Sequence, residues 1–372
     1  MTGAATALMN DALLLLQDLI AIPSFSKEEQ QTANRILHWL QAKGIEAKKS
    51  GNNIYARNLH FEDHKPVILL NSHHDTVMPN AGYTRDPFQP VITDGRLYGL
   101  GSNDAGASLV CLISIFNAYY ASTDLPFNLV LAATAEEEIS GSGGIELLLQ
   151  DTAFREYTAY AHGLESQSWS AIVGEPTLMQ LAVAERGLLV IDAYAEGVAG
   201  HAARQEGINA LYQAMNDINS LRAYHFDKVS PFLGPVQVSV TSIETSNKQH
   251  NIVPADCHFT IDVRVNELYS LEEVLQTLQQ QVQSRLQARS LRLRSTSIAA
   301  QHPLVQAGMQ YAAIPYGSPT TSDKALMPFP ALKMGPGDSA RSHMADEFIF
   351  IDDLQNGIDG YHALLQNIIA YE

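Results

Sequence analysis

Cysteine is almost absent from this sequence. Cys111 and Cys257 are the only 2 cysteines, which excludes a framework of several disulfides and a zinc site built on thiolates. Any metal site in this chain must therefore be made from imidazole and carboxylate side chains.

Basic residues and long apolar runs are also scarce. The chain has 23 Lys and Arg against 40 Asp and Glu, a formal net charge of -17, which argues against nucleic acid or an anionic membrane as a partner. No apolar run is long enough to span a membrane, and the N-terminal stretch lacks the basic start of a signal peptide. We therefore expect a cytoplasmic protein, in which most carboxylates favour solubility and a few can surround a cation.

Apolar residues, in contrast, are plentiful enough for a large core. The 372 residues are 46% hydrophobic, and this length predicts two or three domains. Segments 67–70 and 127–135 are continuous apolar runs, which are typical of strands buried on both faces. A helical segment after Asp104 lies between them. Strand, helix and strand in this order predict an α/β fold with a mixed, largely parallel sheet covered by helices.

Local signals also predict helices near the N-terminus. One helix is expected at about 10–21. Ser26 and Glu29 have the spacing of a capping box, which predicts a second helix that ends at 43–44.

The character of the sequence changes after about residue 178. Segments of alternating polar and apolar residues predict antiparallel strands, and Ser270 with Glu273 predicts a capped amphipathic helix. We therefore expect an α+β domain at 178–292, inserted into a discontinuous outer domain made of 1–177 and 293–372.

Side chains that commonly bind metals follow the predicted strands. They are His73, His74, Asp75, Asp104, the triplet Glu136–Glu138, Glu175 and His343. Taken singly, each has an ordinary explanation, because a loop carboxylate is usually solvated or caps a helix, and His74 fits a packing role. Taken together, they follow parallel strands whose ends meet at one edge of a sheet. Imidazoles and carboxylates without thiolate suit a hydrolytic centre with two zinc ions.

Longer motifs contain these residues, in order along nearly the whole chain. They are SHHDTV, YGLGSNDAG, TAEEEISGSGG, VGEPT, GVAGHAA and GPGDSARSHMADE. This set resembles the motifs of the M20 metallopeptidase family, which includes acetylornithine deacetylase, succinyl-diaminopimelate desuccinylase and glutamate carboxypeptidases. The resemblance implies a zinc-binding α/β domain interrupted by a smaller ferredoxin-like lid, through which we expect a homodimer to form.

The resemblance also implies how two Zn²⁺ ions would be bound, with Co²⁺ or Mn²⁺ as alternatives. His73 and Glu175 would ligate one ion, and Glu138 and His343 would ligate the other. Asp104 would bridge the two ions.

Further roles follow from the same resemblance. Asp75 would orient a metal-binding histidine, and Glu137 would be the general base. From the lid, His201 would contact the scissile carbonyl oxygen, while Asn251 and Arg264 would hold the carboxylate of the substrate.

The expected activity is removal of an acyl group from a small N-acyl amino acid. The GEPT and GPGD motifs most resemble the acetylornithine deacetylase branch, which would place the protein in arginine biosynthesis, but acetyl or succinyl and ornithine or citrulline stay open. The alternatives are an M20-type dipeptidase or carboxypeptidase, a succinyl-diaminopimelate desuccinylase, and an inactive binding module. Glu137 argues against the last, since a binding module needs no general base.

One departure from the family pattern follows the expected bridging residue. The family commonly has Met-Lys-Gly after this Asp, whereas Asp104 is followed by Ala105-Gly106-Ala107. The missing Lys is not a metal ligand, so the departure affects the choice of subfamily rather than metal binding.

Overall fold

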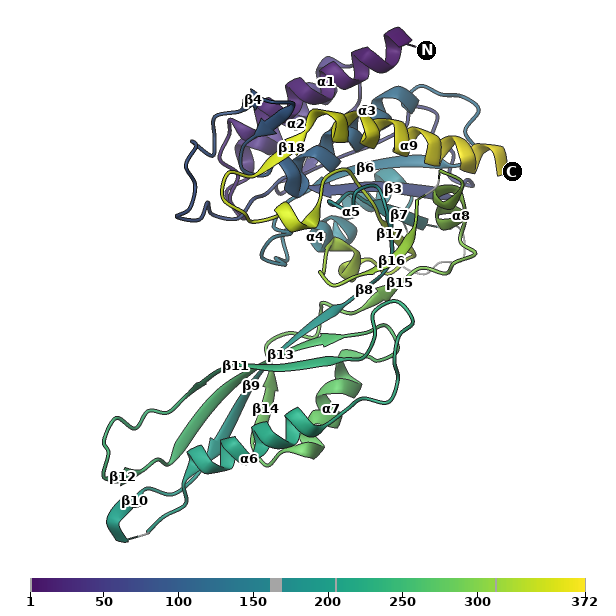
Figure 1. The fold of residues 1–372 in the computed structure, drawn as a ribbon. Helices are drawn as coiled ribbons and strands as arrows, with labels where there is room; N and C mark the ends of the chain where they lie inside the picture. Colours follow the sequence, from purple (N-terminus) through teal and green to yellow (C-terminus); the bar gives the residue numbers. More distant parts are fainter. Residues whose placement is uncertain (1, 161–168, 205, 312, 372) are drawn as a thin grey trace. The chain divides into compact units, whose positions relative to one another are not determined.

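The structure is a computed structural model, and it describes residues 2–160, 169–204, 206–311 and 313–371. The chain divides into two compact units, drawn in Figure 1. The first unit comprises Met1–Val183, Ile298–Tyr316 and Ser322–Glu372, and the second comprises Ala184–Ser297 and Gly317–Thr321. Within the described ranges, no helix combines the length and apolar character needed to cross a membrane.

The first unit is built on a mixed sheet. The strands of this sheet run in the order β1-β2-β6-β3-β7-β17-β8-β15, with β16 beside β8. Of these, β15 and the last residues of β8 and β16 fall within the residue ranges of the second unit. The central strands β6, β3, β7 and β17 are parallel neighbours, while β1, β2, β8 and β15 pair antiparallel. The bounds are β1 Ala47–Ser50, β2 Asn53–Arg57, β3 Val67–His73, β6 Asn128–Thr134, β7 Trp169–Val173, β8 Leu181–Glu185, β15 Thr296–Ser297, β16 Pro315–Ser318 and β17 Ala331–Lys333. The largely parallel α/β fold predicted from the sequence is thus confirmed.

Both faces of the central strands are covered by helices, which explains their continuous apolar runs (Figure 1). In β3, Ile68 and Leu70 belong to a core cluster shared with α1, α2, α3, α8 and α9, whereas Val67 and Leu69 belong to a cluster shared with α4 and α5. The bounds are α1 Thr2–Ile20, α2 Gln30–Ala42, α3 Ala107–Tyr119, α4 Ile145–Gln150, α5 Thr152–Thr158, α8 Pro303–Gln310 and α9 Ile351–Tyr371. α1 begins well before the predicted start near residue 10.

Short elements complete this unit. A small antiparallel sheet has the order β18-β5-β4. The bounds are β4 Val91–Thr93, β5 Arg96–Tyr98, β18 Phe348–Phe350, and for the short helical turns η1 Ser102–Gly106, η3 Asp323–Leu326 and η4 Ser339–Arg341.

The capping box predicted before the second helix is wrong. α2 begins at Gln30, and its cap residue Glu29 makes no side-chain capping hydrogen bond. Instead, Ser26 Oγ donates to Asp75 Oδ2 over 2.7 Å, and the Glu29 carboxylate accepts from the side chain of Asn52 over 2.9 Å. The side chains of Ser26 and Glu29 therefore bind residues from later segments, Asp75 and Asn52, instead of the backbone N–H groups at the start of α2.

The second unit is an antiparallel sheet with two helices packed on one face. The strand order is β11-β13-β9-β14, and all three pairs of neighbouring strands are antiparallel, as the sequence predicts. Buried residues alternate with partly exposed ones along β9. Ser270 and Glu273 form the predicted capping box of α7. The bounds are β9 Gly187–Glu196, β10 Gly200–His201, η2 Ala202–Arg204, α6 Ala210–Ala223, β11 Gln237–Glu244, β12 Ile252–Val253, β13 Asp256–Val265, α7 Leu271–Gln281 and β14 Arg285–Ala288.

Candidate metal centre

The carboxyl ends of three neighbouring parallel strands bring the candidate ligands together. His73 is the last residue of β3 and pairs with the last residue of β6, and the last residue of β7 pairs with β3 two positions earlier. Glu137 and Glu138 follow β6, and Glu175 follows β7. The pairing of the strands therefore positions these side chains along one edge of the sheet.

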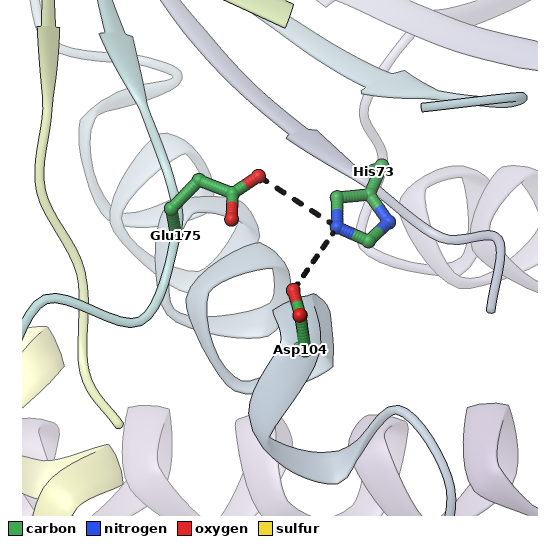
Figure 2. Close-up of side chains that lie close together, drawn as sticks. All are labelled: His73, Asp104 and Glu175. Atoms are coloured by element: carbon green, nitrogen blue, oxygen red, sulfur yellow. Dashed lines mark ion pairs between the residues drawn. The ribbon is translucent and has the colours of Figure 1, made fainter. Parts of the chain in front are cut away.

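One group of three residues forms the first candidate site, shown in Figure 2. His73 Nε2 lies 3.4 Å from Asp104 Oδ1 and 3.7 Å from Glu175 Oε1. Asp104 comes from η1, the turn that precedes α3. All three side chains are nearly buried, with 1% exposure for His73, 13% for Asp104 and 10% for Glu175.

A second group shares Asp104 with the first. His343 Nε2 lies 2.9 Å from Glu138 Oε2 and 3.7 Å from Asp104 Oδ2. Asp104 thus directs one carboxylate oxygen toward each group. Each group has donor atoms that lie within 4.8 Å of one another, so each could hold a metal ion.

The donor atoms fit divalent cations. With tetrahedral bonds of about 2.1 Å, two ligand atoms lie about 3.4 Å apart, and the first group shows 3.4 and 3.7 Å. His73 Nε2 is buried and makes no hydrogen bond to any residue that the structure describes, as expected of an imidazole nitrogen that faces a cation. The mixture of imidazole and carboxylate donors suits zinc.

Carboxylates outnumber imidazoles at this site, which leaves an excess of negative charge. Burial raises the pKa of Glu137 well above its usual value, and Glu175 and Glu138 add to the shift although His73 opposes it. The Glu138 carboxylate, hydrogen bonded to His343, raises the pKa of that imidazole to about 9. Because a divalent cation would offset the excess negative charge, the electrostatics of the site favour cation binding.

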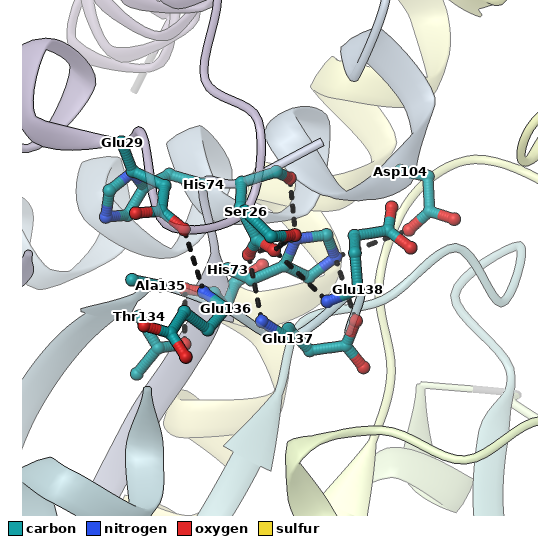
Figure 3. A network of polar contacts seen from close by, with 12 residues as sticks. Ser26, Glu29, His73, His74, Asp104, Thr134, Ala135, Glu136, Glu137 and Glu138 are labelled. Carbon is teal, nitrogen blue, oxygen red and sulfur yellow. Dashed lines mark hydrogen bonds and ion pairs between the residues drawn. The ribbon is translucent and has the colours of Figure 1, made fainter. Parts of the chain in front are cut away.

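Asp75 connects the first histidine to the glutamate triplet, and His73 and the triplet are labelled in Figure 3. His73 Nδ1 lies 3.0 Å from the Asp75 carbonyl oxygen and 3.4 Å from Asp75 Oδ1. The same carboxylate accepts the backbone N–H of Glu137 at Oδ1 and that of Glu138 at Oδ2, each over 3.1 Å. Asp75 therefore orients the imidazole and fixes the backbone of the triplet.

His74 lies outside both groups. It is buried, with Nδ1 2.9 Å from Thr32 Oγ1 and Nε2 3.0 Å from the carbonyl oxygen of Asn52. These contacts give it the packing role that the sequence favoured.

Glu347 supports the site but was not identified from the sequence. Its Oε1 accepts the backbone N–H groups of Asn103 over 2.8 Å and Asp104 over 2.9 Å, and its Oε2 accepts that of Gly101 over 3.0 Å. Burial, followed by the charge of Asp104, raises the pKa of Glu347 to about 8. The only feature of the sequence that could have indicated a role for Glu347 is its position as the last residue of the motif GPGDSARSHMADE, which contains His343.

Asp323 is a second buried carboxylate near the site that the sequence did not reveal. Its Oδ2 accepts from Thr134 Oγ1 over 2.7 Å, and Thr134 ends β6 just before the glutamate triplet. Burial raises the pKa of Asp323 to about 6.

The remaining candidates lie in the second unit. His201 is exposed, and its Nδ1 accepts the backbone N–H of Ala203 over 3.2 Å. Asn251 is also exposed and precedes β12, which pairs with β10, the strand of His201. Arg264 donates to both carboxylate oxygens of Asp262, over 2.8 Å from Nε and 3.1 Å from Nη2. Arg264 thus has a carboxylate partner within its own strand.

Two known proteins with similar sequences carry the same name. The succinyl-diaminopimelate desuccinylase of Delftia acidovorans is 27% identical over 295 residues, which cover 75% of this chain and 73% of that protein. The enzyme of the same name from Cereibacter sphaeroides is 26% identical over 284 residues, covering 73% and 72%.

Solved structures share the fold over almost the whole chain. The M20 family metallo-carboxypeptidase Sso-CP2 from Sulfolobus solfataricus has a TM-score of 0.73 at 17% identity and covers 96% of this chain and 99% of its own. The Bacillus subtilis YXEP protein, a dinuclear metal binding peptidase from the M20 family, has a TM-score of 0.71 at 17% identity, covering 98% and 99%.

The match to a family model is broader than any of the local motifs. The model of peptidase family M20/M25/M40 matches residues 69–367. This match includes every candidate ligand, the second unit and most of α9. The chain therefore belongs to peptidase family M20/M25/M40 and is a hydrolase of that family.

Proposed function

We propose that this protein is an amidohydrolase with two metal ions, which removes an acyl group from small N-acyl amino acids. The observation that carries the proposal is the position of Asp104, whose Oδ1 faces His73 over 3.4 Å and whose Oδ2 faces His343 over 3.7 Å. A carboxylate with one oxygen toward each of two ligand groups is suited to bridge two cations. The dinuclear centre named for the Bacillus subtilis protein supports the same assignment.

The metal ligands in this proposal are the five residues of the two groups. His73 and Glu175 would hold one ion, Glu138 and His343 would hold the other, and Asp104 would contribute to both sites. Their donors favour Zn²⁺, with Co²⁺ or Mn²⁺ as alternatives. Bound here, two such ions would polarise the amide carbonyl and lower the pKa of the attacking water.

Glu137 is the proposed general base. Its Oε2 lies 3.9 Å from His73 Nε2 and its side chain is 13% exposed, so it borders the ligand groups without belonging to either. Glu137 would accept a proton from the water that attacks the amide carbon and would deliver that proton to the leaving nitrogen.

We further propose that the second unit, expected from the sequence at 178–292, acts as a lid. His201 would donate a hydrogen bond to the scissile carbonyl oxygen as negative charge develops on it. Asn251 and Arg264 would bind the substrate carboxylate, which a guanidinium can hold with two hydrogen bonds. For this, Arg264 would exchange the carboxylate of Asp262 for that of the substrate.

The acyl group is proposed to be succinyl rather than acetyl. The similar proteins from Delftia acidovorans and Cereibacter sphaeroides are both named succinyl-diaminopimelate desuccinylase, which supports this choice over three quarters of the chain. The acetylornithine alternative rests on two short motifs, GEPT and GPGD.

A substrate panel tests the proposed reaction. Amine release should be fastest from N-succinyl amino acids with a free α-carboxylate, slower from their N-acetyl counterparts, and at least about tenfold slower from the α-methyl esters, because an ester loses a charged hydrogen-bond partner of the clamp. Equal rates on acids and esters would remove the carboxylate clamp. Faster release from N-acetylornithine than from any succinyl substrate would reverse the choice of acyl group.

The role of His201 is tested by its replacement with alanine. His201→Ala is expected to lower kcat by about two to three orders of magnitude, as loss of one oxyanion donor does in other hydrolases. Bound metal should stay at the wild-type level, since His201 belongs to neither ligand group. His250→Ala is a matched control, because His250 is another exposed histidine of the second unit. Near-normal turnover in His201→Ala would leave this residue a structural role only.

A further inference from the structure

The side chains of the three consecutive glutamates after β6 point in three different directions, as Figure 3 shows. The Glu136 carboxylate accepts the backbone N–H of Gly143 over 3.2 Å. Glu137 points toward His73 over 3.9 Å, and Glu138 pairs with His343 over 2.9 Å. Because the three side chains leave one short turn toward different partners, the conformation of its backbone decides which carboxylate faces which group.

Carboxylates from elsewhere in the chain hold the three backbone N–H groups of this triplet. Asp75 accepts those of Glu137 and Glu138, each over 3.1 Å. Glu29 accepts that of Glu136 at Oε1, over 3.2 Å. The carboxylate that accepts the first of these three N–H groups, Glu29, therefore comes from the segment that leads into α2.

Glu29 is fully buried, with 0% exposure, and its carboxylate is occupied by neighbours other than the helix. Its Oε1 also accepts the backbone N–H of Lys27 over 2.5 Å, and its Oε2 accepts from Asn52 Nδ2 over 2.9 Å. It makes no side-chain hydrogen bond that caps α2. Burying a carboxylate is costly unless it is hydrogen bonded, and these contacts, rather than a helix cap, offset that cost.

The contact with Glu29 is made where the backbone turns sharply. Glu136 has a left-handed conformation with φ 56°, and its carbonyl oxygen accepts the N–H of Gly141 over 2.8 Å. A Cβ at Gly141 would lie 2.0 Å from Glu136 Oε2, so the turn closes tightly around this side chain. Glu29 therefore holds the peptide that enters this turn, directly before Glu137.

We propose that Glu29 is a positioning residue, which fixes the direction of Glu137 through the backbone N–H of Glu136. This inference rests on the proposed function, in which Glu137 is the base. Ser26, three residues earlier, donates to Asp75 Oδ2 over 2.7 Å. Residues 26–29, which have the spacing of a capping box, thus supply one of the two carboxylates that hold the triplet, Glu29. They also supply a hydrogen bond to the other carboxylate, Asp75.

Two conservative variants of Glu29 distinguish the effect of side-chain length from the effect of its negative charge. Glu29→Asp keeps the charge but shortens the side chain, so the carboxylate withdraws from the Glu136 N–H. Glu29→Gln keeps the length, its amide oxygen can still accept that N–H, and Asn52 can turn its own amide to match. Glu28→Gln is the control, because Glu28 is an exposed neighbour.

Glu29→Asp is expected to lower kcat by about 10- to 100-fold, the effect of losing a hydrogen bond to a charged group, with KM and bound metal unchanged. Glu29→Gln and the control should stay within about threefold of wild type, an allowance for ordinary context dependence. If Glu29→Gln is as slow as Glu29→Asp, the charge rather than the contact matters and the inference is overturned. Loss of metal in parallel with kcat would overturn it as well.

Amide hydrogen exchange of the metal-free protein gives a readout that does not depend on activity. Glu29→Asp should speed exchange at Glu136 by about tenfold relative to Glu29→Gln, since a lost hydrogen bond permits local opening; equal exchange would overturn the contact. Full turnover in Glu137→Gln would overturn the base, and this inference with it. Full turnover in Glu29→Asp beside an inactive Glu137→Gln would overturn this inference alone.

Discussion

Replacement of Glu137 by glutamine is expected to lower kcat by about two to four orders of magnitude, the usual contribution of general base catalysis. Glutamine keeps the size and hydrogen-bonding capacity of the side chain but cannot accept the proton. Because Glu137 belongs to neither ligand group, bound metal should stay at the wild-type level. Turnover under saturating substrate and elemental analysis of the same preparation measure both quantities.

The neighbouring glutamates provide matched controls. Glu138→Gln should lose metal, since a neutral amide is a poorer ligand than a carboxylate. Glu136→Gln should change little, because its amide oxygen can still accept the N–H of Gly143. If Glu137→Gln loses metal while Glu138→Gln keeps it, the two roles are assigned to the wrong residues. An active, metal-replete Glu137→Gln would show that Glu137 is not the base.

Removal of metal should have an effect of similar or greater size. Lewis acid stabilisation supplies several kcal/mol to the transition state, so dialysis against a chelator is expected to lower turnover by about three orders of magnitude or more. Dialysis without chelator is the control, and added Zn²⁺ should restore the rate. Undiminished turnover in protein shown to be metal-free would contradict the proposed chemistry.

The position of the site could be predicted from the sequence because strand ends have a simple geometry. His73, Glu138 and Glu175 each follow a continuous apolar run, and such runs form adjacent parallel strands whose carboxyl ends share one edge. The same reasoning predicted the α/β sheet and the alternating strands of the second unit. Both predictions depend on residues close together in the sequence.

Hydrogen bonds between residues far apart in the sequence could not be predicted in this way. Ser26 and Glu29 have the spacing of a capping box, but in the fold they bind Asp75 and Glu136, which lie 49 and 107 residues away in the sequence. Neither partner can be identified from local spacing. Glu347 was missed for the same reason, because its carboxylate serves backbone N–H groups 243, 244 and 246 residues earlier.

The pairing of Arg264 with Asp262 shows a similar limit in the second unit. The two residues are i and i+2 on β13, which places their side chains on one face of the strand. The alternating pattern therefore places the two side chains on the same face, but it does not indicate that the Arg264 guanidinium would bind Asp262. The ester comparison tests whether a substrate carboxylate can replace Asp262.

Asp104 is proposed to bridge two metal ions, and the amount of bound metal tests this role. Metal-free protein would be incubated with excess Zn²⁺, freed of unbound metal and analysed for zinc per chain. We predict two zinc ions per chain for wild type and no more than one for His343→Ala, which removes a donor from the second group only. A wild-type protein that reaches full amidohydrolase activity with one bound ion or none would contradict the account.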